Sequence, residues 1–198
     1  MPSLCHTDPA MVGATIVRDP DRLAAVRRLL LLDAPGKPSF DRLTELAAQL
    51  IEAPIALMTL VDIDRQWFVS ATGIPDELRQ RRQTPLEYSL CQHALRSASP
   101  LVAVDARLDP VLRHVKAVTE YGIVAYAGAP LRFEGQPVGT LCVLDREPRQ
   151  WRPDEIVTLQ RLGEIAADEL RLHFLDKLAA RRKDWTGVVD LRAKRPPW

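Results

Sequence analysis

The sequence lacks the long apolar run that a membrane-spanning helix requires. No stretch approaches the roughly 18 to 20 uncharged apolar residues that cross a bilayer. Charges and prolines interrupt residues 1–21, which therefore have no apolar core of a signal peptide. These absences predict a cytoplasmic protein without membrane contact.

Cysteine is scarce, with 3 in 198 residues, at Cys5, Cys91 and Cys142. Three scattered cysteines are too few for the disulfide framework of a small secreted domain, and no CxxC pair indicates a zinc site. The sequence thus predicts no metal site, and it leaves any cofactor unknown.

An excess of charge of one sign is also missing. The 27 Lys and Arg residues balance 26 Asp and Glu residues, for a formal net charge of +1. Arginines cluster at residues 79–82 and in the tail after residue 180, but aromatic residues that could stack on bases are not interleaved with them. A nucleic-acid partner is therefore not expected.

Familiar catalytic motifs are absent as well. The sequence has no GxSxG motif, no phosphate-binding loop and no HExxH motif. Paired acids such as Asp105 and Asp109 would work as general acid and base only beside a positioned substrate and with shifted pKa values. The sequence favours a binding module over an enzyme.

The hydrophobic share of 46% in 198 residues is enough for one sizeable core. Apolar periodicity predicts the following order of elements. Helices are expected at 21–32, from 39 or 41 to 50, at 89–96 and from 153 to about 174, and strands at 55–61, 66–71, 101–104, 123–131 and 138–144. This order predicts an α+β fold, with a central antiparallel sheet and the terminal helices on one face.

The connection from 105 to 122 is long for a compact domain, and long connections of this kind are often functional lids. Residues 1–20 have no clear period and are expected to form a flexible arm. We expect the folded domain at 21–176 and a basic, disordered tail at 177–198.

Six short segments between residues 21 and 172 resemble the GAF domains of sensory proteins. They are Phe40–Leu43, Val61–Phe68, Ser89–Ala94, Asp105–Pro110, Tyr126–Leu131 and Gly139–Arg146. The resemblance implies a GAF/PAS-like sheet whose free face is covered by a lid, a small ligand bound between them, and a homodimer formed through the terminal helices. Apolar residues such as Leu30, Leu172 and Leu175 are available for a parallel helical dimer.

Departures from the family's better-known branches leave the ligand open. The Asn-Lys…Phe…Asp-Glu pattern of the cyclic-nucleotide binders is missing, and Cys91 is followed by Gln92, where covalent bilin attachment typically uses Cys-His. The cysteine arrangement of the GAF-type free methionine sulfoxide reductases is not found either. One scaffold serves many ligands in this family, so the fold does not name this one.

Eight residues on the expected sheet, short helix and lid are candidate ligand contacts because they carry aromatic, hydroxyl, thiol, imidazole or carboxylate groups. They are Trp67, Ser89, Cys91, His93, Asp105, Asp109, Tyr121 and Tyr126. Ser89 can cap backbone N–H groups that could also hold an anionic group of a ligand. Each has a structural alternative: Trp67 as cover of the hairpin, Tyr126 and His93 as hydrogen-bonded core residues, and Asp109 as part of a turn.

Two other functions compete with ligand sensing. Cys91 and Cys142 would approach each other if the short helix packs over the strand at 138–144, which would suit a thiol-dependent redox enzyme or redox sensor. Alternatively, side chains could fill the cavity and leave a ligand-free dimerisation module. Because no kinase, cyclase or DNA-binding segment follows in this sequence, we expect a signal to pass through a partner protein.

Overall fold

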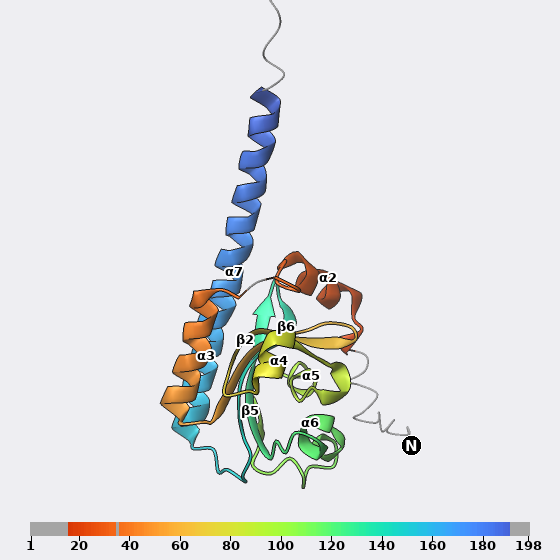
Figure 1. Cartoon of the computed structure of the whole chain (residues 1–198), viewed down its shortest axis with the longest axis vertical. Coiled ribbons are helices and arrows are strands. Elements are labelled where there is room, and N and C mark those ends of the chain that lie inside the picture. Colours follow the sequence, from red (N-terminus) through yellow and green to blue (C-terminus); the bar gives the residue numbers. More distant parts are fainter. Residues whose placement is uncertain (1–15, 35, 191–198) are drawn as a thin grey trace, which may run out of the picture.

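A six-stranded antiparallel sheet forms the centre of the molecule in the computed structural model, which describes residues 16–34 and 36–190 (Figure 1). The spatial order of the strands is β3-β2-β1-β6-β5-β4. Their bounds are β1 Ile55–Val61, β2 Arg65–Thr72, β3 Gln83–Pro85, β4 Leu101–Ala103, β5 Ala125–Phe133 and β6 Gln136–Asp145. The predicted α+β fold with a central antiparallel sheet is confirmed.

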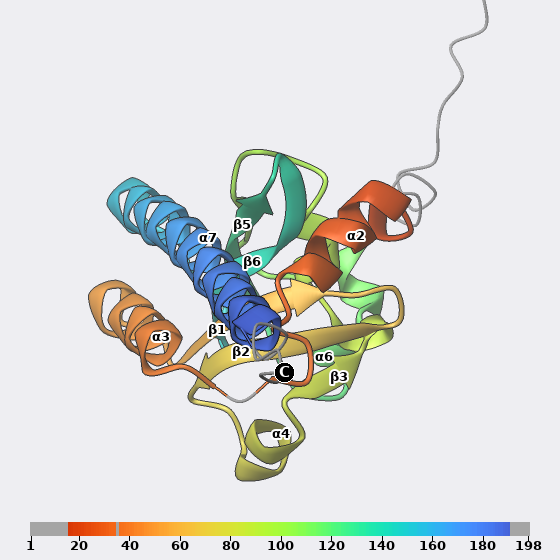
Figure 2. The same ribbon diagram turned by 90° about the horizontal axis from the view of Figure 1, so that it is seen from above.

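Helices cover both faces of the sheet, the long ones on one face and the short ones on the other. Their bounds are α2 Pro20–Arg28, α3 Pro38–Ile51, α4 Asp76–Arg81, α5 Cys91–Ala94, α6 Lys116–Thr119 and α7 Pro153–Asp190, with 3-10 turns η1 at Leu86–Tyr88 and η2 at Leu112–His114. Figures 1 and 2 show α3 and α7 side by side against one face, and α5 and α6 on the opposite side.

Local sequence explains where the terminal helices begin. Asp19 caps α2, which begins one residue before the expected start at 21, since its carboxylate accepts a hydrogen bond of 2.9 Å from the Arg22 backbone N–H. Proline occupies the first turn of both α2 and α3, where its missing N–H costs nothing.

Two separate apolar cores lie on the two sides of the sheet. On the side of α3 and α7, Met58 and Leu141 pack with helix residues such as Phe40 and Leu159. On the other side, the strand residues are Leu57, Phe68, Tyr126, Cys142 and Leu144, among others. Every residue of β1 is buried, which explains why its sequence is an almost unbroken apolar run.

Several segments differ from the sequence-based expectation. The polar connection at 73–86 contains α4 and β3, both too short to show a period. Helix α7 continues to Asp190, so residues 177–190, expected in a disordered tail, are helical because they extend an already nucleated helix. Val17, expected in the flexible arm, is buried.

The rest of the arm and the last residues, 1–15 and 191–198, lie outside the described residues. Within the described part of the chain, no helix is both long and apolar enough to cross a membrane.

Candidate functional site

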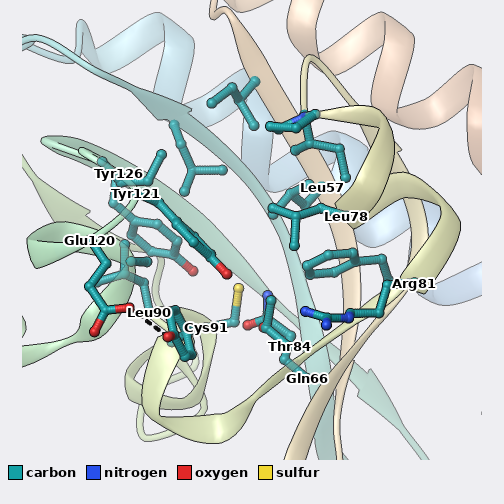
Figure 3. Close-up of a pocket in the computed structure, with 18 of the residues that line it drawn as sticks. Leu57, Gln66, Leu78, Arg81, Thr84, Leu90, Cys91, Glu120, Tyr121 and Tyr126 are labelled. Atoms are coloured by element: carbon teal, nitrogen blue, oxygen red, sulfur yellow. Dashed lines mark hydrogen bonds between the residues drawn. The ribbon is translucent and has the colours of Figure 1, made fainter.

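A cavity of about 360 Å³ lies between the sheet and the short helices (Figure 3). Its floor is apolar and comes from three neighbouring strands, with Leu57 on β1, Phe68 on β2 and Leu144 on β6. Leu78 of α4, Leu90 before α5 and Ala117 of α6 approach it from the roof. The cavity therefore sits where the resemblance placed a ligand, between sheet and lid.

Contacts between α6 and η1 hold the end of the lid in place. The rings of Tyr88 and Tyr121 stack with centroids 4.9 Å apart, and Tyr88 Oη donates a hydrogen bond of 2.6 Å to Glu120. Arg146, which follows β6, donates to the Tyr121 carbonyl oxygen at 2.7 Å. We call Tyr88, Glu120, Tyr121 and Arg146 the lid latch, since they join the lid to the rest of the cavity wall.

Two buried hydroxyl groups at the cavity have no hydrogen-bond partner among the described residues. They are Tyr126 Oη, on β5, and Thr84 Oγ1, on β3, and both residues line the cavity. Burial raises the pKa of the Tyr126 phenol well above its usual value, so this group stays neutral and can donate a hydrogen bond. An orphaned buried hydroxyl is costly, which favours a polar partner inside the cavity.

Ser89 acts on the cavity through Gln66. The fully buried Ser89 hydroxyl donates to the side-chain oxygen of Gln66, and it accepts a hydrogen bond of 3.2 Å from the Gln92 backbone N–H at the start of α5. Gln66 itself lines the cavity. Ser89 therefore satisfies one backbone N–H group in the first turn of α5 and fixes the orientation of a lining amide, but it does not line the cavity itself.

Two free cysteines meet beneath this helix. Cys91 begins α5 and lines the cavity, while Cys142 lies on β6 and is fully buried. Their sulfur atoms are 3.6 Å apart. Thr59 and Thr140, whose hydroxyls are 3.2 Å apart on the adjoining strands β1 and β6, together with Tyr126, form a hydroxyl cluster around the thiols.

Three of the eight candidate contacts, Cys91, Tyr121 and Tyr126, line the cavity together. Figure 3 shows Cys91 between the two tyrosines and the pair Gln66 and Thr84.

Trp67 belongs to the opposite side of the sheet. It is buried in the core with α3 and α7, and the guanidinium groups of Arg65 and Arg82 lie over its ring, 5.5 and 5.4 Å from the ring centroid. Neighbouring residues on a strand point to opposite faces, so Gln66 and Phe68 reach the cavity and Trp67 does not. Trp67 therefore has the structural role considered from the sequence, which is to cover the hairpin, and it is not a ligand contact.

His93, Asp105 and Asp109 are also placed away from the cavity lining. Burial lowers the pKa of His93 to about 4, and the nearby Arg96 adds to the effect. Asp105 forms an ion pair of 2.6 Å with Arg107. Asp109 accepts hydrogen bonds of 2.8 Å from the backbone N–H groups of Val111 and Leu112, which is the turn role considered from the sequence.

Sequence reasoning missed several lining residues, namely Gln66, Thr84, Arg81, Tyr88, Glu120 and Arg146. Gln66 was within reach of the sequence, because strand alternation puts it opposite Trp67. Tyr88 and Thr84 belong to elements of three residues, for which no periodic signal exists. Arg81, Glu120 and Arg146 are exposed charged residues at the mouth, and charge by itself does not separate them from ordinary surface residues.

Known proteins resemble this chain in both sequence and structure. A family model described as GAF domain matches residues 37–170. A cyclic di-GMP phosphodiesterase of Pseudomonas aeruginosa is 39% identical over 130 residues, which are 65% of this chain and 21% of that protein. The chain thus spans about a fifth of the length of this curated relative.

Two solved structures share the fold at low sequence identity. The GAF domain of an Acinetobacter phosphoenolpyruvate-protein phosphotransferase superposes with a TM-score of 0.59 at 15% identity, covering 77% of this chain and 94% of that one. The blue-light absorbing form of the PixJ GAF domain of Thermosynechococcus elongatus gives a TM-score of 0.57 at 20% identity, covering 83% and 96%. Likeness at this level of identity concerns the fold.

Proposed function

Because the chain belongs to the GAF domain family, we propose that it is a cytoplasmic sensory domain that binds a small molecule in the cavity beneath its lid. The observation that carries this function is the cavity of about 360 Å³ with two buried hydroxyl groups that find no partner in the described part of the chain. Ligand pockets in proteins have volumes of about 300 to 1,000 Å³, mostly apolar walls and a few convergent polar groups. A module with a plugged cavity would have neither the space nor the orphaned hydroxyls.

The walls indicate the kind of molecule that fits. The apolar floor suits a ligand with an apolar body, and the hydroxyls of Tyr126 and Thr84 are available to hydrogen-bond a polar group of it. Charges of both signs, Arg81 and Arg146 with Glu77 and Glu120, stand near the mouth. We infer a small, largely apolar molecule with one or two polar groups.

A route from the ligand to α7 runs through the end of β6. Arg146 contacts the lid, and Arg149, three residues later, pairs with Asp145 at 3.5 Å and with Glu155, in the first turn of α7, at 2.8 Å. A ligand that orders the lid would thus change the position of the first turn of α7 through these ion pairs. A ligand can shift such an equilibrium only by binding one lid conformation more tightly than the other.

The exposed side of α7 supports the homodimer as part of this function. Val157, Ile165, Leu172 and Leu175 are large apolar residues with about half of their surface exposed. Their spacing along one side of the helix is typical of a helix–helix seam.

Light scattering after gel filtration tests the dimer. Replacing both Leu172 and Leu175 with Glu should convert a dimer into a monomer with the same circular dichroism per residue. Leu108→Glu is the control, because Leu108 is 80% exposed on the lid and far from α7 in sequence. A parent protein that is monomeric at tens of micromolar, or a double variant that stays dimeric, would contradict the α7 interface.

The ligand is best sought with the protein itself. Native mass spectrometry and an absorption spectrum of freshly purified protein detect a retained molecule, and a thermal-shift screen of metabolites detects one that is lost on purification. Leu57→Trp places an indole ring in the cavity, and Val102→Trp places the same ring on an exposed position of β4.

Ligands of the proposed site should raise the melting temperature of the parent and of Val102→Trp, but not of Leu57→Trp. Hits that stabilise all three proteins equally would mean that binding occurs elsewhere. The proposal of a polar ligand would be contradicted if the screen gave no hits and xenon bound in the cavity, because xenon occupies apolar cavities that hold no water.

A redox enzyme is the second candidate, favoured by the two free thiols 3.6 Å apart at the cavity. It requires turnover of a small sulfoxide such as free methionine sulfoxide with a dithiol as reductant, and loss of that turnover in Cys91→Ser. A sensor without catalysis keeps its ligand affinity in the same variant.

We also propose a partner that receives the signal. The relative from Pseudomonas aeruginosa joins a segment similar to this one to a much longer chain that is named for cyclic di-GMP phosphodiesterase activity. That arrangement supports a role in which the domain controls a partner enzyme of signal-nucleotide turnover. Addition of the domain, with and without its ligand, to such an enzyme should change the rate of hydrolysis only if the two proteins associate.

A further inference from the structure

We propose that Cys91 and Cys142 are a peroxide-responsive thiol pair that closes into a disulfide between the roof and the floor of the cavity. The inference goes beyond ligand sensing and holds whether or not a ligand binds. It rests on the position of the two sulfur atoms, on which of them reaches the cavity, and on the groups that surround them.

The two residues come from elements of different rigidity. Cys142 is in the middle of β6, which is paired on both sides, with Leu57 of β1 and with Gly128 of β5. Cys91 is the first residue of α5, a helix of only 4 residues in the roof. Because a disulfide bond is about 2.05 Å long, the sulfur atoms must approach by about 1.5 Å from their distance of 3.6 Å. Rotation of the Cys91 side chain and a small shift of α5 can supply that movement.

The cavity gives an oxidant access to one thiol only. Cys91 lines the cavity and Cys142 does not, although both side chains are almost completely buried. A molecule the size of hydrogen peroxide fits easily into a space of about 360 Å³. Cys91 is therefore the thiol that meets the oxidant, and Cys142 is the thiol behind it.

The surroundings assign the same roles. Burial raises the pKa of the Cys91 thiol, but hydrogen bonding by Cys142 and by the hydroxyls of Thr140 and Thr59 lowers it, to about 7. Burial and the neighbouring Cys91 raise the pKa of Cys142 well above its usual value. A thiolate is the reactive form of cysteine, so the first attack comes from Cys91.

The chemistry balances with a hydroperoxide as the oxidant. The Cys91 thiolate attacks one peroxide oxygen, the O–O bond breaks, and the leaving alkoxide or hydroxide takes up a proton, which leaves Cys91 as a sulfenic acid. The sulfur of Cys142 then attacks Cys91 Sγ, the S–O bond breaks, and hydroxide departs with the Cys142 proton as water. In total, two thiols lose two electrons, and the hydroperoxide becomes an alcohol, or water, plus one further water.

The new bond would change the site that it crosses. It ties α5 to β6, closes the chain between residues 91 and 142, and removes from the cavity wall a thiol that adjoins Tyr126. Reduction by a small dithiol restores both thiols. Oxidation of this pair would thus alter the cavity in a reversible way.

The experiment uses the full chain with Cys5→Ser as background, so that Cys91 and Cys142 are the two remaining thiols. The folded protein is treated with hydrogen peroxide near pH 7, quenched by alkylation and weighed by mass spectrometry. Both thiols should disappear together, with a mass loss of about 2 Da that dithiothreitol reverses, and peptide mapping should find residues 91 and 142 joined.

Single variants separate the two roles. In Cys142→Ala the product should be a sulfenic acid, with a mass gain of about 16 Da that dimedone captures at Cys91. In Cys91→Ala no rapid oxidation should occur, because the remaining thiol does not line the cavity. Circular dichroism checks that each variant is folded. The parent protein unfolded in urea shows how fast the same thiols oxidise when the cavity and its surroundings are absent.

Failure of the parent to form the 91–142 bond, while its unfolded chain oxidises, would overturn the inference. So would equal oxidation of Cys142 in the Cys91→Ala variant. Because the readout is the mass of the sulfur groups, these results are independent of ligand binding, which the cavity-filling variant Leu57→Trp tests separately.

Discussion

Gly128 allows the Tyr126 ring to lie flat against the sheet. The two residues are on the same face of β5, and a Cβ atom at Gly128 would stand 2.1 Å from Tyr126 Oη and 2.5 Å from the ring carbon that bears it. No real contact is that short. Because glycine carries only a hydrogen atom in place of Cβ, the Tyr126 phenol can lie over residue 128 and point toward Cys91 and the cavity.

We expect Gly128→Ala to force the Tyr126 side chain out of its place. Overpacking of this kind destabilises a protein by about 1 to 3 kcal/mol. Unfolding in urea measures the free energy, and a double-mutant cycle with Tyr126→Ala should show strong coupling, because the methyl group has nothing to displace once the ring is gone. Purely additive effects would mean that the clash is relieved without moving the ring.

Arg22 is a fully buried arginine that binds three backbone carbonyl groups. Its guanidinium nitrogen atoms donate to the carbonyl oxygens of Ile16, Val61 and Val17 at 3.0, 2.7 and 2.6 Å. Val61 ends β1, so one side chain joins α2, the segment before it and the central strand.

Arg22→Lys should destabilise the domain by about 2 to 4 kcal/mol, because an ammonium group cannot reach three carbonyl groups in this fork-like arrangement. Urea unfolding checks the value. Arg18→Lys is the control, since Arg18 is exposed one turn earlier. If Arg22→Lys lowered the free energy of unfolding no more than Arg18→Lys does, the three hydrogen bonds would contribute little to stability.

At the scale of elements, the lid is held along its length by buried residues such as Ala106, Leu112 and Val118, and at its end by the lid latch. The chain between residues 105 and 121 is mostly turns, with one 3-10 turn and the 4-residue helix α6. The lid latch connects its end to the neighbouring wall, and hydrogen bonding to Glu120 raises the pKa of Tyr88. A segment built of short turns opens more easily than the continuous sheet below it.

Tyr88→Phe should loosen the lid without moving the sheet. It removes the hydrogen bond to Glu120 and keeps the ring that stacks on Tyr121. We expect amide hydrogen exchange in residues 112–121 to become about twofold to tenfold faster, with β1 and β6 unchanged. Tyr121→Phe is the matched control, as it keeps both the stack and the Tyr88–Glu120 bond. Equal exchange in all three proteins would place the restraint on the lid elsewhere.

Over the whole molecule, the half-buried His93 and the buried His173 link stability to pH. Burial lowers the pKa of His93 to about 4, and burial together with Lys37 and Lys177 lowers that of His173, whose ring nitrogens have no partner among the described residues. A histidine with a lowered pKa in the folded state binds its proton more readily when unfolded. The contribution of these neutral histidines to the free energy of unfolding is therefore fully present above about pH 6.5. It is lost as the pH falls toward about 4.

Urea unfolding at several pH values between 4 and 7.5 should show this loss. His93→Gln should flatten the dependence, while His114→Gln, on an exposed residue of the lid, should follow the parent protein. A free energy of unfolding that is constant from pH 7 to 5 would be at odds with neutral, buried imidazoles.

Much of this molecule is determined by local sequence. The almost unbroken apolar run at 55–61 predicted a strand, and the order of helices and strands predicted the α+β sheet. The six short segments identified the GAF family, which the family model confirms. Such features are readable because burial repeats with the period of the element, and a period needs only neighbouring residues.

Tertiary structure alone decided the composition of the site. Elements as short as β3 and η1 have no period, so the sequence could not place Thr84 and Tyr88 at the cavity. The pleat of β2 sent Trp67 to the core and Gln66 to the cavity, although both are reasonable ligand contacts by chemistry. The sequence could suggest that Cys91 and Cys142 meet, but not their distance of 3.6 Å. Contacts between residues 51 positions apart depend on how α5 settles on β6, and that is fixed by the packing of the whole chain and not by the residues beside them.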